Sequence, residues 1–323
     1  MHTLRVEVLR RPPRDRSIVQ YLAGRIHITL TSLQYLHVGS GEELKIEESK
    51  ISEILKRVRD PNSIKSEMQR QIQYLSAFSS IGDTLLIPGS TVKGNVRSRL
   101  ELSFKNVNGK VDSCFLKAGV LKSEPLEGMQ GWRHYRLWRD RINEDRGPPC
   151  DYTRSESVCL ICDLFGTNGL RGLVEFSDLT LEHGGKEVLD LPYNMRLEAV
   201  KPDSVFKGSI NFFNIMPEEL GLILIGMGLT DKRSGKPVLL GRLKYIKEIS
   251  GRRFGRVIYT VESLELSKYS RPLDIDGSIL LEPGQNVSGE RLEKIISQLT
   301  SYALRRYPGL DVIDEVEALE RVT

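Results

Sequence analysis

Residues 87–101 read IPGSTVKGNVRSRLE, which is a turn followed by the start of a helix. Pro88 and Gly89 make the turn, because both residue types punctuate regular structure. Apolar residues then recur at every fourth position, on one helical face; they are Val92, Val96, Leu100 and Phe104. The stretch therefore predicts an amphipathic helix that packs one face against a core.

The beginning of this helix has the features of a phosphate-binding site. Its first backbone N–H groups lack helical partners, and the positive end of the helix dipole attracts anions. Ser90 or Thr91 can cap the helix, and Lys93 and Arg97 project on the same side. We expect these four residues to contact a phosphate backbone; the alternative is a capped helix whose basic residues face water. A P-loop is excluded, because Lys93 precedes the second glycine.

Strand-like segments precede and follow this helix, and two further helices lie later in the chain. Alternating apolar and polar residues predict strands at Arg25–Leu30, Leu173–Leu181, Gly208–Ile215 and Arg256–Leu264. Helical patterns cover Pro217–Leu229 and Ser288–Tyr307. The order strand, helix, strand, strand, helix, strand predicts an α+β protein with a ferredoxin-like core.

Two segments interrupt this order and are predicted to be insertions. Residues 44–77 read as two helices that Pro61 separates. Residues 107–165 have no sustained periodicity and contain all four cysteines. We expect one domain over residues 1–290, with a C-terminal helix and an acidic tail at 291–323.

The composition is that of a globular protein. The chain has 323 residues, of which 39% are hydrophobic and 28% are charged. Its longest apolar run, Leu220–Leu229, is half the length of about 20 residues that a membrane helix needs, which excludes an integral membrane protein. The basic N-terminus is followed by no apolar segment, so we expect no secretory signal. Four cysteines are too few for a disulfide scaffold and suit a reducing cytoplasm.

Positive charge is concentrated in one late segment, Lys232–Arg256. It contains nine basic residues and one acidic residue, whereas the whole chain has a net charge of only +4. Such a concentration repels itself unless a polyanion neutralises it, so nucleic acid is the expected ligand and a solvated loop is the alternative. The residues expected to contact RNA here are Arg242, Lys244, Arg252, Arg253 and Arg256.

The cysteines have the spacing of a zinc site. Cys159 and Cys162 form a CxxC pair, and Cys150 lies nearby in the sequence. Tetrahedral zinc needs a fourth ligand, for which His134 is the favoured candidate and Cys114 the alternative. With four protein ligands the zinc would be structural, because no coordination position stays open for a substrate.

Three motifs together resemble the RAMP superfamily, the RNA-binding subunits of CRISPR effector complexes. They are IPGSTVKGNVRSRLE at 87–101, CLICDLFG with RGLVEFSDL within 159–179, and GRRFGRV at 251–257. The resemblance covers about residues 22–260 and is closest to the repeated backbone subunit of type III complexes, of the Csm or Cmr kind. It implies a modified RRM-like core, a cytoplasmic role in antiviral defence, and guide RNA, target RNA, other RAMP subunits and the large signature subunit as partners.

The resemblance also implies a β-hairpin thumb that inserts between bases. It would lie at about residues 184–202, with Met195 and Arg196 near its tip. An apolar side chain there can wedge a base while an arginine holds a phosphate.

Cutting members of the family carry an aspartate after the first strand, near the position of His37–Gly41 (HVGSG) here. This sequence has Glu42 and Glu43 instead. A glutamate side chain is longer than that of aspartate, so its carboxylate is displaced, and catalytic geometry tolerates little displacement. We therefore expect a subunit that does not cut. The alternatives are an endoribonuclease that uses Glu42 or Glu43 with Mg²⁺ or Mn²⁺, with His37 as acid or base, and a free-standing repeat-processing enzyme.

Overall fold

The computed structural model describes residues 4–45, 48–71, 73–115, 124–129, 131–192 and 195–322. Its centre is an antiparallel sheet in which β3 (Leu22–Ser32) lies between β14 (Val205–Ile215) and β16 (Arg256–Leu266). Strand β11 (Leu179–His183) pairs with the other edge of β14, again antiparallel. Each of these strands contains or overlaps one that the sequence pattern predicts.

The core elements follow the predicted order. Along the chain they are β3, α3 (Gly89–Ser103), β10 (Val174–Phe176) with β11, β14, α6 (Pro217–Gly226) and β16. This is the order of a ferredoxin-like fold, and it confirms the predicted fold class. The one strand predicted at Leu173–Leu181 is divided into β10 and β11 at Ser177 and Asp178.

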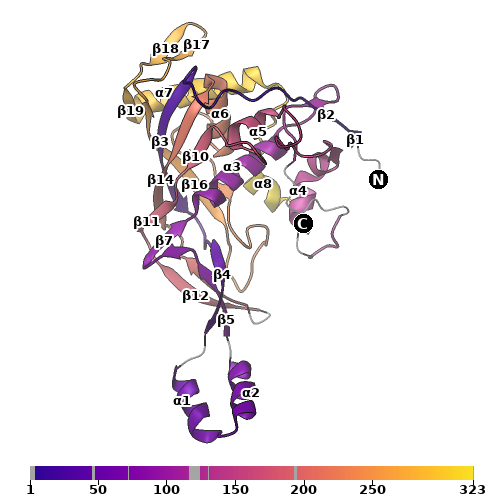
Figure 1. The fold of residues 1–323 in the computed structure, drawn as a ribbon, viewed down its shortest axis with the longest axis vertical. Helices are drawn as coiled ribbons and strands as arrows, with labels where there is room; N and C mark the ends of the chain where they lie inside the picture. Colours follow the sequence, from indigo (N-terminus) through magenta and orange to yellow (C-terminus); the bar gives the residue numbers. More distant parts are fainter. Residues whose placement is uncertain are drawn as a thin grey trace.

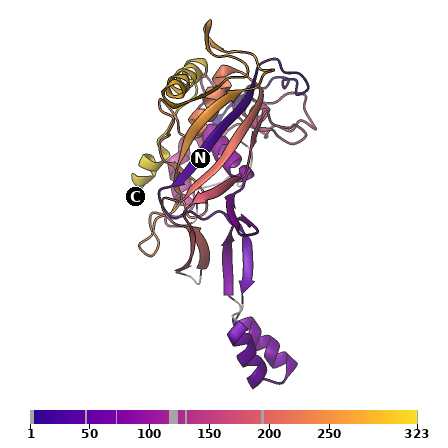
Figure 2. The same ribbon diagram turned by 90° about the vertical axis from the view of Figure 1, so that its left-hand side faces the viewer.

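The helices cover one face of the sheet. Buried Ile26, Ile28 and Leu30 alternate along β3 with residues that are at least partly exposed, as in an antiparallel sheet with one buried face. Figure 1 shows α3 and α6 on one side of the sheet, and Figure 2 shows the other face with no described helix in front of it. The predicted apolar face of α3 is confirmed, because Val92, Val96 and Leu100 are fully buried.

Helix α7 (Gly289–Arg306) completes the helical layer by packing on α6. Its buried residues are the predicted stripe Leu292, Ile295, Ile296, Leu299 and Ala303, with Thr300. The two helices approach closely at Gly221, where a Cβ atom would lie 2.2 Å from the carbonyl oxygen of Leu299. Glycine is therefore required at this crossing.

The insertion at 44–77 is a helical hairpin on a two-stranded stalk. Helices α1 (Glu48–Arg57) and α2 (Pro61–Gln71) confirm the predicted pair, and Pro61 opens the second helix. The sequence predicts helices up to both ends of the insertion, but the structure has strands there. These are β4 (Gly39–Lys45) and β5 (Gln73–Phe78). These strands pair with each other, and Figure 1 shows the helices projecting beyond them from the body of the protein.

The stalk is part of a second sheet with the order β12-β13-β5-β4. Strands β12 (Lys186–Leu191) and β13 (Met195–Val200) form an antiparallel hairpin at the position predicted for the thumb. Strand β13 also pairs in parallel with β5, at Arg196 with Leu75. The hairpin and the stalk are therefore held together as one sheet.

The insertion at 107–165 contains short elements that hold the N-terminal segment. Strands β8 (Lys110–Val111) and β9 (Glu144–Asp145) pair with β2 (Glu7–Val8) and β1 (Leu4–Arg5) respectively. The helices in this insertion are α4 (Trp132–Ile142) and α5 (Leu160–Phe165).

The remaining elements are β6 (Ser80–Ile81), β7 (Thr84–Ile87), β15 (Val238–Leu239), β17 (Leu273–Ile275), β18 (Ser278–Leu281), β19 (Asn286–Ser288) and α8 (Glu315–Glu320). Within the described ranges, every helix is too short or too polar to cross a bilayer.

Candidate functional site

The four cysteines come together in the interior. The sulfur atoms of Cys114, Cys150, Cys159 and Cys162 all lie within 4.8 Å of one another, and all four residues are buried. Zinc–sulfur bonds of about 2.3 Å in a tetrahedron give sulfur–sulfur distances of about 3.8 Å. The observed distances from Cys114 Sγ are 3.5 Å to Cys162 and 3.7 Å to Cys159. The cluster is therefore compatible with a structural zinc site.

Helix α5 and the backbone around it orient these thiols. Cys159 precedes the first residue of α5 and Cys162 lies in its first turn, so the CxxC spacing directs two sulfur atoms to one point. The backbone N–H of Cys159 donates to Cys150 Sγ (3.2 Å), and that of Cys114 donates to Cys159 Sγ (3.4 Å). Such donors favour the thiolate form that binds metal.

The prediction of His134 as the fourth ligand is wrong, because the structure places Cys114 there. His134 lies on α4, where its ring meets the ring of Tyr245 at 4.8 Å between centroids. Burial lowers the pKa of His134 to about 4, so this imidazole is neutral at physiological pH. His134 is thus a packing residue between α4 and the basic segment.

The start of α3 is not a free phosphate site. The backbone N–H of Gly89 donates to the carboxylate of Asp178 (2.7 Å), which places a negative charge at the N-terminus of the helix. Ser90 is exposed and Thr91 is half-buried. The predicted anion site is therefore already occupied by the chain's own acid, and the same contact explains why Ser177 and Asp178 divide the strand predicted there.

Gly89 has to be glycine because α3 begins against β10. A Cβ atom at this position would lie 2.1 Å from the carbonyl oxygen of Phe176. We expect Gly89→Ala to lower the free energy of unfolding by about 1–3 kcal/mol, since backbone must move to relieve the clash. Gly94→Ala in the same helix meets nothing within 4 Å and is expected to raise stability by up to about 1 kcal/mol. Urea denaturation of both variants tests this; equal effects would contradict it.

Arg97 is a buried structural residue, which corrects its predicted contact with RNA. Its Nε donates to Glu101 (2.7 Å) and its Nη1 to the carbonyl of Gly166 (2.7 Å). Its Nη2 donates to Cys162 Sγ (3.2 Å). Lys93 lies on the same side, half-buried, and burial together with the charge of Arg97 lowers its pKa.

The basic segment lies against the opposite side of α3. Asn95 donates to the carbonyl of Leu239 (2.7 Å), and Arg99 pairs with Glu315 of α8. Two residues along a helix are a rotation of about 200°, so Asn95 faces away from Lys93. Lys93 and Arg97 therefore do not form one RNA-binding groove with the basic segment, although the sequence predicts RNA contacts for both elements.

The predicted RNA-binding cations of the basic segment interact within the chain to different degrees. Arg253 is exposed and lies 3.9 Å from Glu248 and 4.0 Å from Glu320. Arg256 pairs with Glu320 of α8, and only 16% of its side chain is exposed. Lys244 is half-buried over the ring of Tyr245, and burial lowers its pKa. The acidic tail therefore neutralises part of the positive charge that the sequence concentrates here.

The other cations lie beside the hairpin. Leu243, Ile249 and Phe254 of the basic segment pack on apolar residues of β12 and β13; these are Leu189, Leu191, Leu197 and Ala199, with Met195 at the edge. Arg242 donates to Ser76 on β5 (3.0 Å). We call β12, β13 and residues 242–254 the hairpin–loop surface.

Four cations in the loop part of the hairpin–loop surface, residues 242–254, are at least partly exposed. Arg242, Lys247 and Arg253 are exposed and Arg252 is partly exposed, over the ring of Tyr35 at 6.0 Å. On the hairpin itself, Arg196 pairs with Asp190 (2.9 Å). The predicted residues Met195, Arg196, Arg242, Arg252 and Arg253 are thus brought together on this surface. Lys244 lies in the same loop but is half-buried, and Lys93, Arg97 and Arg256 lie outside the surface.

The predicted acid or base His37 is buried, with 1% exposure. Its Nδ1 is hydrogen-bonded to the carbonyl oxygen of Glu198 (2.6 Å), and burial lowers its pKa. It therefore has no route to a bound RNA in this structure. Glu42 and Glu43 lie in β4, where their backbone pairs with Ser76 and Leu75; their side chains lie outside the described part of the structure.

Glu198 is a residue that the sequence analysis missed. Its carboxylate accepts hydrogen bonds from the backbone N–H of Phe78 (3.0 Å) and from Lys186 (2.8 Å). It thereby joins β13 to β5 and β12, which holds the hairpin against the stalk. A single glutamate within a strand sequence does not indicate that its side chain joins neighbouring strands.

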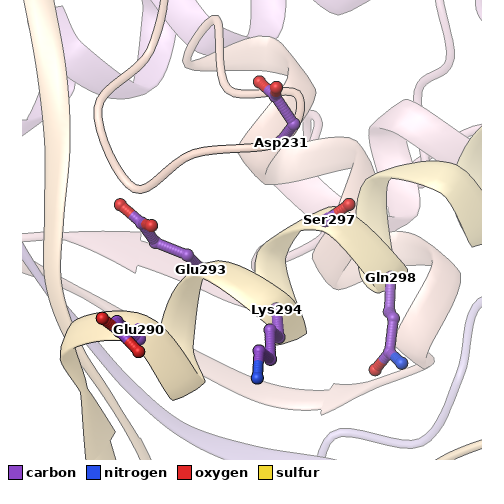
Figure 3. A pocket seen from close by; sticks show the side chains of 6 residues that line it. All are labelled: Asp231, Glu290, Glu293, Lys294, Ser297 and Gln298. Carbon is purple, nitrogen blue, oxygen red and sulfur yellow. The ribbon is translucent and has the colours of Figure 1, made fainter.

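A surface hollow of about 560 Å³ on α7 is unsuited to phosphate. Figure 3 shows five of its side chains along α7 and Asp231 on the facing loop. Asp231, Glu290 and Glu293 supply three carboxylates against one cation, Lys294. The hollow repels a polyanion and is therefore not a candidate for RNA. The hairpin–loop surface, with its exposed cations, is the candidate nucleic-acid interface.

Comparison with known proteins agrees with this architecture. A model of the RAMP superfamily matches residues 29–262, from within β3 to within β16. No curated protein matches the chain. The matched part includes α3, the cysteine cluster, the hairpin and the basic segment. Because the match spans most of the chain, this protein belongs to the RAMP superfamily.

Proposed function

We propose that this protein is a guide-RNA-binding subunit of a type III CRISPR effector complex, of the Csm or Cmr kind, and that it does not cut RNA. Membership of the RAMP superfamily suggests a CRISPR-associated, RNA-binding role. The type III assignment rests on the likeness of its motifs to the repeated backbone subunit of those complexes.

The observation that carries the proposal is the hairpin–loop surface. The apolar contacts of Leu243, Ile249 and Phe254 hold an exposed group of cations against the hairpin. Arg242, Lys247, Arg252 and Arg253 can contact phosphates without reading sequence. Met195 is the first residue of β13 and is partly exposed, so it can wedge a base of guide or target RNA.

The arrangement around the first strand supports a subunit without chemistry of its own. His37 is buried, and β4 carries Glu42 and Glu43 through a regular backbone ladder. The alternative, cleavage of target RNA by Glu42 or Glu43 with Mg²⁺ or Mn²⁺, needs one of these carboxylates to reach the RNA backbone. Other RAMP subunits and the large signature subunit are the expected protein partners.

Fluorescence anisotropy with single-stranded RNA tests the binding mode. We expect two unrelated sequences of equal length to bind with similar Kd. The logarithm of the binding constant should fall with the logarithm of salt concentration, with a slope of about −0.7 per phosphate contacted. A strong sequence preference, or binding that salt does not weaken, would contradict the proposal.

The same RNA, incubated with the assembled complex, complementary guide and Mg²⁺ or Mn²⁺, tests the absence of cleavage. We expect intact RNA. A regular ladder of products that disappears in Glu42→Ala or Glu43→Ala would establish the endoribonuclease instead.

A further inference from the structure

Arg97 connects the cysteine cluster to helix α3. The side chain is buried, and its three donor groups point in three directions. Nε donates to Glu101, one turn later in α3, and Nη1 donates to Gly166 at the end of α5. Nη2 donates to Cys162 Sγ at 3.2 Å. The first two contacts fix the direction of the third.

A sulfur atom in this position gains more from such a donor as a thiolate than as a thiol, because a thiol sulfur is a weak acceptor. Four thiolates around Zn²⁺ carry a net charge of −2, and a buried charge is costly unless it receives hydrogen bonds. Arg97 brings a guanidinium N–H to one of these sulfur atoms, Cys162 Sγ. Charged donors give the stronger hydrogen bonds.

We propose that Arg97 is a positioning residue for the metal, which sets the affinity of the cluster for zinc by stabilising the Cys162 thiolate and orienting α5. This role is independent of RNA binding. The proposed role explains why an arginine is buried at position 97. A shorter or apolar side chain there would leave Cys162 Sγ without this hydrogen-bond donor.

The test replaces the arginine and its carboxylate partner together. Arg97→Met alone takes the guanidinium away from the buried carboxylate of Glu101 and can unfold the protein, whereas the double variant Arg97→Met with Glu101→Gln also removes the buried negative charge. We expect the double variant to fold and to bind zinc 10–100-fold more weakly than the native protein, the usual loss when an outer partner of a metal ligand is removed.

Arg99 provides a matched control on the same helix. Arg97 and Arg99 are buried to the same extent, each with 9% exposure, and Arg99 pairs with Glu315 and not with a cysteine. The variant Arg99→Met with Glu315→Gln should keep the zinc affinity within about twofold of the native value, well below the change expected for the Arg97 pair. Circular dichroism at the assay temperature verifies that each variant is folded.

Competition with a chromophoric chelator gives the zinc affinity, and the visible spectrum with Co²⁺ reports the ligand set. We expect tetrahedral four-thiolate bands in all three proteins, with weaker metal affinity in the Arg97 pair alone. Native affinity in that pair, or equal loss in both pairs, would overturn the proposal. A native protein that takes up no zinc would overturn it as well.

Discussion

Replacing Cys114 with serine is expected to remove zinc binding, whereas His134→Ala is expected to leave it intact. The thiol of Cys114 lies within 4 Å of two other sulfur atoms, at 3.5 Å from Cys162 and 3.7 Å from Cys159. A hydroxyl is a poor ligand for zinc in a thiolate site, so three ligands would remain. The loss should exceed the roughly 10–100-fold that follows removal of an outer partner.

The same substitution should destabilise the fold. Binding of a structural zinc contributes about 10–16 kcal/mol in small zinc-binding peptides, and the binding energy is part of the folding energy. Here the metal would join α5 to the segments that carry Cys114 and Cys150, inside the main core. We expect chelation of the native protein to lower its thermal midpoint and to have little effect on the Cys114→Ser variant, which has no zinc to lose.

Elemental analysis of purified protein measures this directly, with one zinc per chain expected in the native protein and in His134→Ala. His134→Ala serves as the control for lost packing, because it removes the contact with Tyr245 without touching a sulfur atom. Zinc retained by Cys114→Ser and lost from His134→Ala would contradict the site.

The periodic elements of the fold could be predicted from the sequence because burial alternates with the period of each element. Leu292, Ile295 and Leu299 recur on one face of α7, and this apolar face is the one that is buried. The alternation of Ile26, Ile28 and Leu30 likewise identifies the buried face of β3. These patterns are local, and local spacing is what a sequence displays.

The partners of polar groups could not be predicted in the same way. Arg97 and Arg252 are both basic residues in glycine-containing stretches, yet one is buried against a cysteine and the other is on the surface. Cys114 precedes Cys150 by a long segment with no metal-binding spacing. The parallel pairing of β13 with β5 joins the β12–β13 hairpin to the stalk, and no local pattern specifies it.

Charge reversal on the hairpin–loop surface is expected to weaken RNA binding strongly. We expect the double variant Arg252→Glu with Arg253→Glu to weaken RNA binding by about tenfold or more at 0.1 M salt, equally for all sequences. Loss of two phosphate contacts should also make the salt slope shallower by about 1.4. The reason is that these side chains are held beside the hairpin and face solvent.

A control with the same change in charge separates this site from the net charge of the protein. Lys268 and Lys294 are exposed. Lys268 follows the far end of β16, about 35 Å from Arg256 by the length of the strand. Lys294 lies on α7 in the acidic hollow. Lys268→Glu with Lys294→Glu therefore alters the total charge by the same amount without touching the proposed interface.

The most direct measurement is the Kd of single-stranded RNA for the native protein and for these two double variants, over a range of salt concentrations. We predict a weaker Kd and a shallower salt slope for the Arg252 and Arg253 variant, and native values for the lysine variant. Equal weakening of both variants, or native binding by the arginine variant, would contradict the assignment of the hairpin–loop surface as the RNA-binding site.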